Sequence, residues 1–320
     1  MERTFRQQLF FLALCLCVLT GHSRHVENND IIKDELSSFI NSELKREMNE
    51  ELIYRRPLRC LDMVAVEGQF TFTAERPQLN CAAFFMADPT ELISIDYDNV
   101  DIDCRGGDFI KVFDGWVMKG ERFPSVFDHP LLLHERYIDY CGSGSIRRNV
   151  RSSQNVAMVF FRIHSAGSSF TITVRKLINP FPCNVISQTS EGSYTMVIPQ
   201  QHKNCSFSII YPVEVQISEF NLGRYDNFPK RTMSGCAESG DYVQLLGGNV
   251  IDTSKLLPVT DFCMSFTGRT NMKIGCDNTV VRMVSSGKFV SRVSFSYRLL
   301  DNQELQTIKL NNVEDFCFND

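Results

Sequence analysis

Cysteine is the residue type whose number and spacing in this 320-residue chain imply chemistry most directly. Two cysteines, Cys15 and Cys17, lie in an apolar N-terminal run, and ten follow it: Cys60, Cys81, Cys104, Cys141, Cys183, Cys205, Cys236, Cys263, Cys276 and Cys317. A zinc site would need closely spaced pairs such as Cys-x-x-Cys, and the sequence has none. We therefore expect disulfides, each contributing about 3–4 kcal/mol if neighbours along the chain are joined. The residues alone leave the pairing open.

Hydrolytic and nucleotide chemistry have no signature in the sequence. The chain contains no Gly-x-Ser-x-Gly, His-Glu-x-x-His, phosphate loop or dinucleotide fingerprint. A Ser-His-Asp triad is assembled in space, so one sequence does not exclude it. The candidate histidines lie in polar, loop-like segments, where we expect solvated side chains: His129, His134, His164 and His202. The sequence therefore predicts no enzyme and no cofactor.

The net charge of −5 is concentrated in one segment. Residues 27–51 hold eight acidic and three basic side chains, so the remainder of the chain sums to zero. Because no basic field exists to neutralise phosphate backbones, nucleic acid is not an expected partner.

The N-terminus predicts a secretory signal peptide over residues 1–23. Arg3 and Arg6 precede an apolar run from Leu9 to Thr20, and Gly21 and Ser23 are small residues of the kind that signal peptidase requires. The run is shorter than the roughly 20 apolar residues of a membrane span. We expect cleavage after Ser23, a secreted, extracellular and soluble product, and no membrane insertion.

Residues 24–59 are predicted to form an N-terminal arm. Apolar residues recur there at steps of three and four, with charges between them: Ile32, Leu36, Phe39, Ile40, Leu44, Met48 and Leu52. This spacing indicates an amphipathic helix, while the charge density is equally compatible with a mobile segment.

Downstream of the arm, one sequence unit occurs twice. Cys104 is followed by Gly107, Asp108 and strand-forming residues, and Cys236 is followed in the same way by Gly240 and Asp241. Apolar residues alternate with polar ones in runs of about ten residues that end in Gly, Pro, Asn or Asp, which is typical of an antiparallel sandwich. The expected fold is therefore all-β, with two tandem domains over residues 60–176 and 183–299. The proline-containing segment 177–182 is predicted to join them, and 300–320 to form a polar tail.

The repeated unit resembles a CUB domain. Long and specific motifs of one family occur at residues 54–63, 68–74, 76–79, 81–85, 106–109, 113–116, 151–158, 181–189 and 276–288. On these motifs, the whole mature chain resembles the corticotropin-releasing factor-binding protein family. The resemblance implies five sequential disulfides: Cys60–Cys81, Cys104–Cys141, Cys183–Cys205, Cys236–Cys263 and Cys276–Cys317. It also implies CUB-like antiparallel sandwiches stapled by these bonds.

The resemblance further implies a function. Members of that family bind corticotropin-releasing factor and urocortin-like peptides outside cells and keep them from their receptors. Their ligand-determining positions correspond to Arg56 and Asp62, beside the first cysteine, and their glycosylation sequon falls on Asn204. We expect sequestration of an amphipathic helical peptide, with Arg56 and Asp62 supplying charge at the rim of an apolar site. The alternative is that these two residues are solvated surface charges beside a structural disulfide.

A second interpretation is a generic extracellular CUB-pair module that binds another protein, with or without calcium. Asp108 occupies the position of a CUB calcium ligand, with Asp98, Asp101 and Asp103 close in sequence. A hard cation needs six or more oxygen ligands, and the later acid of calcium-binding CUB domains is missing from both copies. No metal site is therefore expected. Aromatic residues could also line a ligand site, namely Trp116, Phe85, Phe109, Phe113 and Phe160. Most are expected in the core, and Trp116 is left open.

Overall fold

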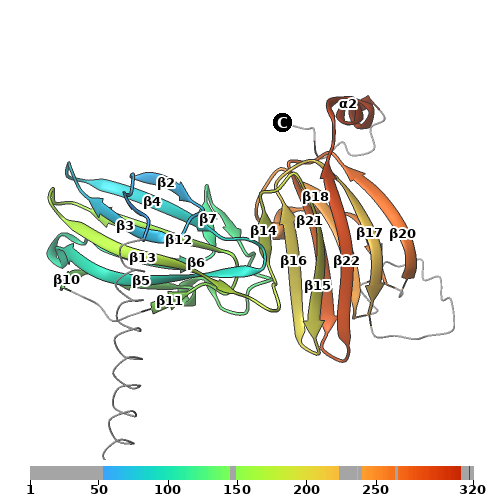
Figure 1. Ribbon diagram of the computed structural model, residues 1–320, viewed down its shortest axis with the longest axis horizontal. Coiled ribbons are helices and arrows are strands. Elements are labelled where there is room, and N and C mark those ends of the chain that lie inside the picture. Colours follow the sequence, from blue (N-terminus) through green and yellow to red (C-terminus); the bar gives the residue numbers. More distant parts are fainter. Residues whose placement is uncertain are drawn as a thin grey trace, which may run out of the picture. The chain divides into compact units, whose positions relative to one another are not determined.

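The computed structural model describes residues 53–144, 149–222, 236, 240–263, 266–310 and 317. The predicted signal peptide and nearly all of the predicted arm lie outside these residues. The described β-structure belongs to one compact unit, residues 55–320. It forms two β-sandwiches, which confirms the predicted all-β fold with two tandem sandwiches (Figure 1).

The first sandwich packs two sheets against each other. One sheet has the order β1 (Arg55–Pro57), β3 (Gly68–Thr73), β13 (Ser169–Ile178), β5 (Glu91–Ile102) and β10 (Gly142–Gly144), with β11 (Asn149–Arg151) also paired to β5. The other has the order β2 (Leu61–Val64), β4 (Leu79–Met86), β12 (Val156–Ile163), β6 (Phe109–Asp114) and β9 (Tyr137–Tyr140). Alternating side chains such as Phe70, Phe85 and Phe161 fill the space between the sheets.

The second sandwich is built in the same way. One sheet has the order β14 (Val185–Ser187), β16 (His202–Ile209), β21 (Asn278–Ser286), β18 (Tyr242–Gly248) and β19 (Leu257–Phe262). The other has the order β15 (Glu191–Pro199), β22 (Val290–Leu299), β17 (Val213–Asn221) and β20 (Phe266–Ile274). Its core contains Phe207, Met283 and Phe295.

Short elements complete the chain. A two-stranded hairpin is formed by β7 (Trp116–Met118) and β8 (Glu121–Phe123), and 3-10 turns lie at Cys104–Gly106, Leu133–Glu135 and Thr253–Lys255. Helix α2 (Asn302–Leu310) lies in the segment predicted to be a polar tail. It begins with a capping box, in which Asp301 Oδ1 accepts from Glu304 N at 2.8 Å and Glu304 Oε2 accepts from Asp301 N at 3.0 Å.

Two boundaries of the elements differ from the expected domain limits. Strand β1 lies within the segment predicted as arm, because Arg55–Pro57 pair in parallel with Gln69–Thr71 of β3. Strand β13 continues to Ile178, into the predicted connector, and pairs with β5 up to Glu91. The division into domains at 177–182 otherwise remains a prediction.

Five disulfides join the cysteines in sequential pairs: Cys60–Cys81, Cys104–Cys141, Cys183–Cys205, Cys236–Cys263 and Cys276–Cys317. These are the pairs that the family resemblance implied. Four of them lie within one sandwich each, and the fifth ties Cys317, beyond α2, to the second sandwich.

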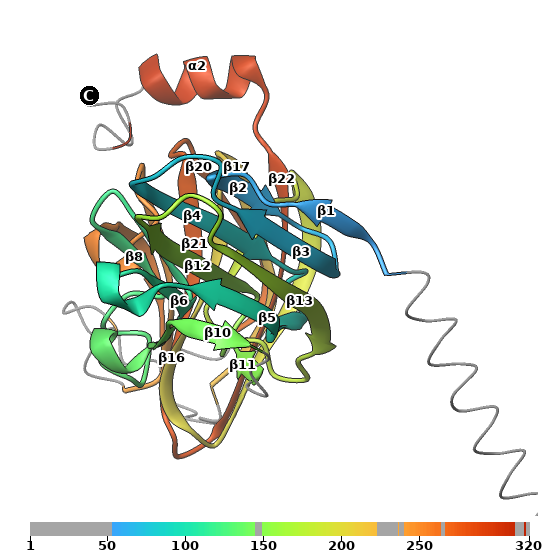
Figure 2. The ribbon, with the colours of Figure 1, turned by 90° about the vertical axis from the view of Figure 1, so that its left-hand side faces the viewer.

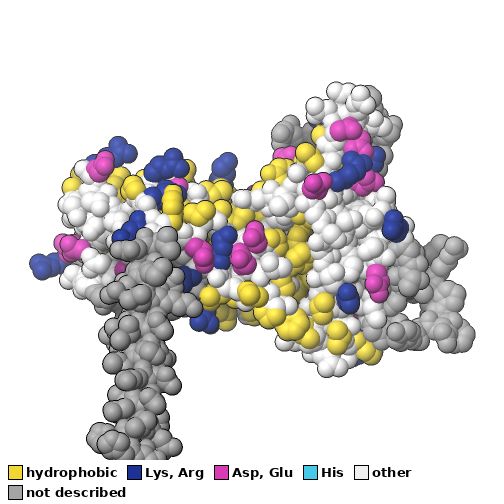
Figure 3. Space-filling model, in the orientation of Figure 1, with side chains coloured by type: hydrophobic (Ala, Val, Ile, Leu, Met, Phe, Trp, Pro, Cys, Tyr) yellow, Lys and Arg dark blue, Asp and Glu magenta, His cyan; other side chains and the backbone are white. Residues whose placement is uncertain are grey.

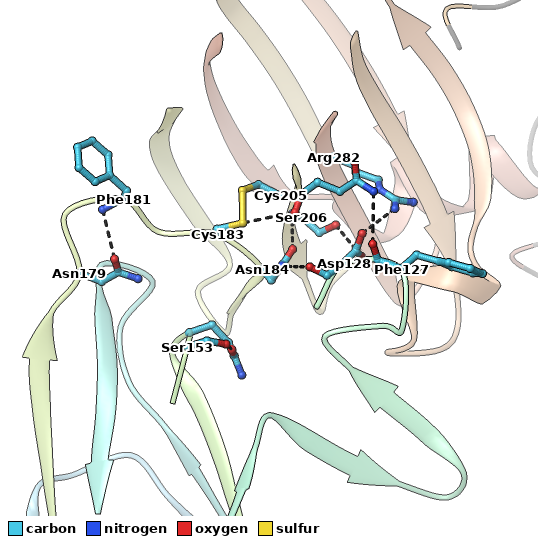
Figure 4. The surroundings of a disulfide bond; sticks show 12 residues. Phe127, Asp128, Ser153, Asn179, Phe181, Cys183, Asn184, Cys205, Ser206 and Arg282 are labelled. Carbon is cyan, nitrogen blue, oxygen red and sulfur yellow. Dashed lines mark hydrogen bonds and ion pairs between the residues drawn. A yellow bond between two sulfur atoms is a disulfide. The ribbon is translucent and has the colours of Figure 1, made fainter. Parts of the chain in front are cut away.

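Polar side chains connect the two sandwiches. Asp128, in the loop after β8, has a side chain that is 1% exposed and lies 2.6 Å from Arg282 Nη2 on β21. Its Oδ2 also accepts from Ser206 at 3.2 Å, and its carbonyl accepts from Asn184 Nδ2 at 2.9 Å (Figure 4). Thr253 donates to the same Oδ2 at 2.5 Å. The first sandwich therefore contributes one buried carboxylate to a polar cluster made by the second.

Candidate functional site

The candidate site lies at the sheet edges formed by β1 and β2. Each of these short strands pairs in parallel with one neighbour, β1 with β3 and β2 with β4, so they form the edges of the two facing sheets (Figure 2). The turn between them is held by buried Leu58, whose N–H donates to Thr71 O at 2.8 Å, and by the Cys60–Cys81 disulfide. The chain thus crosses from one sheet to the other within a few residues.

Arg56 and Asp62 meet across this crossing. Arg56 Nη1 lies 2.7 Å from Asp62 Oδ2 and Nη2 lies 3.1 Å from Oδ1, which is a bidentate ion pair. The Asp62 carboxylate also accepts from Arg59 N at 3.1 Å, Arg59 Nη2 at 3.2 Å and Met63 N at 3.0 Å. The guanidinium carbon of Arg56 lies 5.6 Å from the centroid of the Phe70 ring.

The environment keeps Asp62 ionised. Burial by itself would raise the pKa of this carboxyl, but the hydrogen bonds from Arg56 and Arg59 outweigh burial and lower the pKa to about 2. Its side chain is fully buried, whereas Arg56 keeps 25% of its side chain exposed. The structure therefore brings the two predicted binding residues together as an internal ion pair that joins the two sheet edges. Asp62 has no exposed surface for a ligand.

Two apolar residues beside this ion pair were missed by the sequence reasoning. Leu61 and Met63 flank Asp62 on β2 and are 74% and 53% exposed, while Asp62 and Val64 point inward. A period of two was visible in Leu61-Asp62-Met63-Val64, but the ordinary rule of apolar inside and polar outside would turn Leu61 and Met63 inward, which is the reverse of the structure. Only the buried ion pair decides that the leucine and methionine point outward.

Asn204, the predicted glycosylation site, lies on β16 and is half-buried. Its Nδ2 donates to Phe127 O at 3.4 Å, next to the polar cluster of Asp128. Ser206, the third residue of the sequon, is fully buried with its hydroxyl on Asp128.

Asp108, the acid at the position of a CUB calcium ligand, binds the protein itself. The buried Asp108 carboxylate accepts from the His164 N–H at 2.9 and 3.0 Å, and His164 Nδ1 lies 2.5 Å from Asp108 Oδ1. In the second sandwich, Asp241 takes the same role and accepts from Ser286 N at 2.8 Å and Ser286 Oγ at 2.7 Å. In the part of the chain that the structure describes, no three His, Cys, Asp or Glu side chains gather into a metal site.

A serine, a histidine and an aspartate do meet in the first sandwich, in a geometry unsuited to catalysis. His129 Nε2 lies 2.9 Å from Asp114 Oδ2 and 3.3 Å from Ser153 Oγ, and His129 Nδ1 accepts from Leu131 N at 3.0 Å. Both partners thus share one ring nitrogen, whereas a triad needs the serine and the carboxylate on opposite nitrogens. The expectation that His129 is solvated was wrong, because the residue is 6% exposed.

Trp116, left open by the sequence, is a core residue. It is 4% exposed, and its Nε1–H lies 3.2 Å from Phe85 O and 3.1 Å from Ala157 O. Its ring packs edge-on against Phe84, with centroids 5.7 Å apart. The indole therefore secures the β7–β8 hairpin onto the sheet. Separately, no helix among the described residues has the length and apolar content to cross a bilayer.

Known proteins match this chain over nearly its whole length. The model of the corticotropin-releasing factor binding protein N-terminal domain matches residues 52–178, and that of the C-terminal domain matches residues 185–306. The corticotropin-releasing factor-binding proteins of Homo sapiens and Mus musculus are each 54% identical over 318 residues, which cover 99% of this chain and 99% of each relative. That of Xenopus laevis is 54% identical over 309 residues, which cover 96% of both chains.

Proposed function

Because the chain belongs to the corticotropin-releasing factor-binding protein family, we propose that it binds corticotropin-releasing factor and urocortin-type peptides without chemical turnover. The protein acts outside the cell, where it sequesters the peptide and so limits activation of the receptor. Cleavage of the signal peptide after Ser23 delivers it there.

The observation that carries this proposal is the match to both family models together with 54% identity over 99% of the chain. Two structural features are compatible with it. The Ser153, His129 and Asp114 arrangement lacks the geometry of a hydrolase, and buried acids such as Asp108 are occupied by backbone and side-chain donors of the protein itself. Both features favour binding over catalysis.

For Arg56 and Asp62, the proposal assigns a positioning role in peptide binding. Their ion pair fixes the edge strands β1 and β2 and so determines which side chains face the peptide. Arg56, with a quarter of its side chain exposed, is the member of the pair that a bound peptide can reach.

Calorimetric titration of the full secreted chain with corticotropin-releasing factor tests the proposal. We expect saturable binding, an unchanged affinity after addition of a chelator, and suppression of the peptide's signal in a receptor reporter assay. Absence of binding would refute the proposal. Binding of other extracellular proteins that is lost with chelator would favour the generic, calcium-dependent module instead.

We propose that Asn204 carries an N-linked glycan. Its side chain is half-buried and keeps one hydrogen bond to Phe127 O, which leaves the second Nδ2 hydrogen for the sugar linkage. Intact-mass measurement before and after glycosidase treatment should show one N-glycan, which is lost in Asn204→Gln. That substitution is preferable to Ser206→Ala, since Ser206 also donates to Asp128. An unchanged mass after glycosidase treatment would contradict the assignment.

A further inference from the structure

One sheet of the first sandwich carries an apolar area on its outer face. Leu61, Ala82 and Phe160 face each other in register on the successive strands β2, β4 and β12. Met63 lies two residues beyond Leu61 on the same face, and Phe109 of β6 contacts Phe160 with ring centroids 5.5 Å apart. We call these five residues the apolar shelf.

The shelf is the open half of this face. Its inner boundary is formed by Phe84 and Met158, which are in register with Met63 and are 6% and 7% exposed in the apolar cluster that includes Trp116. On the shelf, by contrast, Leu61 and Met63 are largely exposed, and the other three residues are half-buried. Gln188 Nε2 lies 3.8 Å from Met63 Sδ, so the segment after β14 borders the shelf.

Cations surround the shelf. Arg59 exposes 77% of its side chain, and the Arg162 guanidinium lies 5.0 Å from the Phe109 ring centroid while donating to Gly107 O at 2.7 Å. Lys111 pairs with the exposed Asp139 at 3.6 Å. Together with Arg56, four cations face the two carboxylates of Asp62 and Asp139, which leaves an excess of two positive charges. Figure 3 shows basic side chains beside apolar ones where β2 and β4 run in Figure 1. A partner with an acidic flank would be attracted to this border.

The local backbone disfavours a partner that adds a strand. The Met63 N–H donates to Asp62 Oδ1 at 3.0 Å, and the Arg59 N–H donates to Asp62 Oδ2 at 3.1 Å. These donors of the edge are therefore already satisfied within the chain, as in natural edge strands that resist pairing. A helix, which brings its own backbone hydrogen bonds, has no such requirement. From β2 to β6 the shelf spans three strand spacings, about 14 Å, which accommodates a helix about 10–12 Å wide.

We propose that the peptide binds to the apolar shelf as an amphipathic helix, with its apolar stripe on Leu61 and Met63 and an acidic flank beside Arg59 and Arg162. This inference rests on the proposed function and identifies the surface and the bound conformation. The Arg56–Asp62 ion pair acts here as a positioning element, because it turns Leu61 and Met63 outward.

Single substitutions on β2 test the shelf. We expect Leu61→Glu and Met63→Glu each to weaken binding of corticotropin-releasing factor at least tenfold in calorimetric titration, because a charge replaces an apolar contact of the interface. The matched control is Leu257→Glu, on edge strand β19 of the second sandwich, where the leucine is 48% exposed. This control should bind like the wild type. Circular dichroism of the wild-type mixture should show a gain of helix over the sum of the separate components.

The cations around the shelf are tested separately. Arg59→Gln should weaken binding several-fold and reduce its dependence on salt, since one cation facing the acidic flank is lost. Arg175→Gln is the control, because Arg175 is also an exposed arginine paired to an acid, Asp96, but lies on the opposite sheet. Equal effects of the two substitutions would refute the proposed contact between the cations around the shelf and an acidic flank of the peptide.

The outcomes separate the two proposals. If the wild type fails to bind the peptide, the proposed function fails. If the wild type binds and Leu61→Glu and Met63→Glu bind equally well, the peptide lies elsewhere and the shelf is refuted. If these variants bind normally but change the sedimentation coefficient from dimer to monomer, the shelf is a contact between copies of the chain. Thermal melts should show both variants folded, because their side chains point outward.

Discussion

At the residue scale, the environment of Asp62 explains why a carboxylate can be buried at a sheet edge. Five hydrogen bonds from Arg56, Arg59 and Met63 replace the water that the carboxylate loses. Removal of one partner of such a pair costs more than the pair contributes, because the remaining charge is left without compensation. The ion pair therefore connects the two sheet edges and makes the stability of the protein depend on pH.

Asp62 makes the stability of the protein dependent on pH in the acid range. Because folding lowers the pKa from 3.8 to about 2, the folded state is favoured by about 2 kcal/mol above pH 4, and this contribution is lost as the pH falls toward 2. In Asp62→Asn the contribution is absent at every pH. Urea unfolding should therefore show a large difference between wild type and variant at neutral pH, and a smaller one near pH 2.

Asp96→Asn is the control for this comparison, since Asp96 pairs with Arg175 at the surface. An exposed pair contributes less than about 1 kcal/mol. A difference between wild type and Asp62→Asn that stayed constant from neutral pH to pH 2 would contradict the assignment.

The sequence predicted part of the site at this scale. The resemblance singled out Arg56 and Asp62, and the structure places them in contact, while their role toward the peptide stays a prediction. Leu61 and Met63 could not be recognised, because their outward direction depends on an ion pair between two strands of different sheets. The burial of His129 was not predicted for a similar reason, because its partners Asp114 and Ser153 are distant in sequence.

At the scale of elements, the long alternating runs were predicted and the short or capped elements were not. Strands β5 and β22 carry enough alternating residues, and β12 a long enough apolar run, to be recognised from the chain alone. Strands β1 and β2 have three and four residues, and they are strands only because β3 and β4 pair with them. Helix α2 had a local signal, the Asp301-x-x-Glu304 capping box, which the polar composition of the tail concealed.

The β7–β8 hairpin depends on its tryptophan. Trp116→Phe should keep most of the ring packing on Phe84 but remove the indole N–H from Phe85 O and Ala157 O, lowering the free energy of unfolding by about 2–3 kcal/mol. Urea unfolding followed by circular dichroism measures this change. Because this is the single tryptophan of the chain, the wild type should also show blue-shifted emission protected from iodide. Emission typical of exposed tryptophan would contradict the burial.

At the scale of the whole molecule, the contacts between the sandwiches combine specific polar contacts with an apolar cluster. The side-chain amide of Asn155 binds both backbone groups of Ile186, as a neighbouring strand would. Its Nδ2 donates to Ile186 O at 2.7 Å and its Oδ1 accepts from Ile186 N at 3.0 Å. The Ile186 side chain is buried in the same apolar cluster as Trp116 and Met158. A buried and fully hydrogen-bonded side chain such as Asn155 fixes one arrangement of the two sandwiches. Any displacement of one sandwich against the other would leave several polar groups without partners. The sequence contained no signal for this, since no residue of one sandwich indicates its partner in the other.

Asp128 is the residue on which this connection depends most. Its carboxylate accepts from Arg282 and Ser206 (Figure 4) and from Thr253 of the second sandwich, and from Ser125 of the first. Asp128→Ala therefore leaves a nearly buried guanidinium and three hydroxyls without this acceptor. The substitution should lower the free energy of association of the two sandwiches by about 3–5 kcal/mol, a loss that an interface between two small domains does not usually tolerate. In scanning calorimetry, the wild type should unfold in one transition, and Asp128→Ala should separate it into two. Asp139→Ala, which removes an exposed partner of Lys111, should leave the single transition in place. A single, unshifted transition in Asp128→Ala would show that the two sandwiches are held together by their apolar contacts alone.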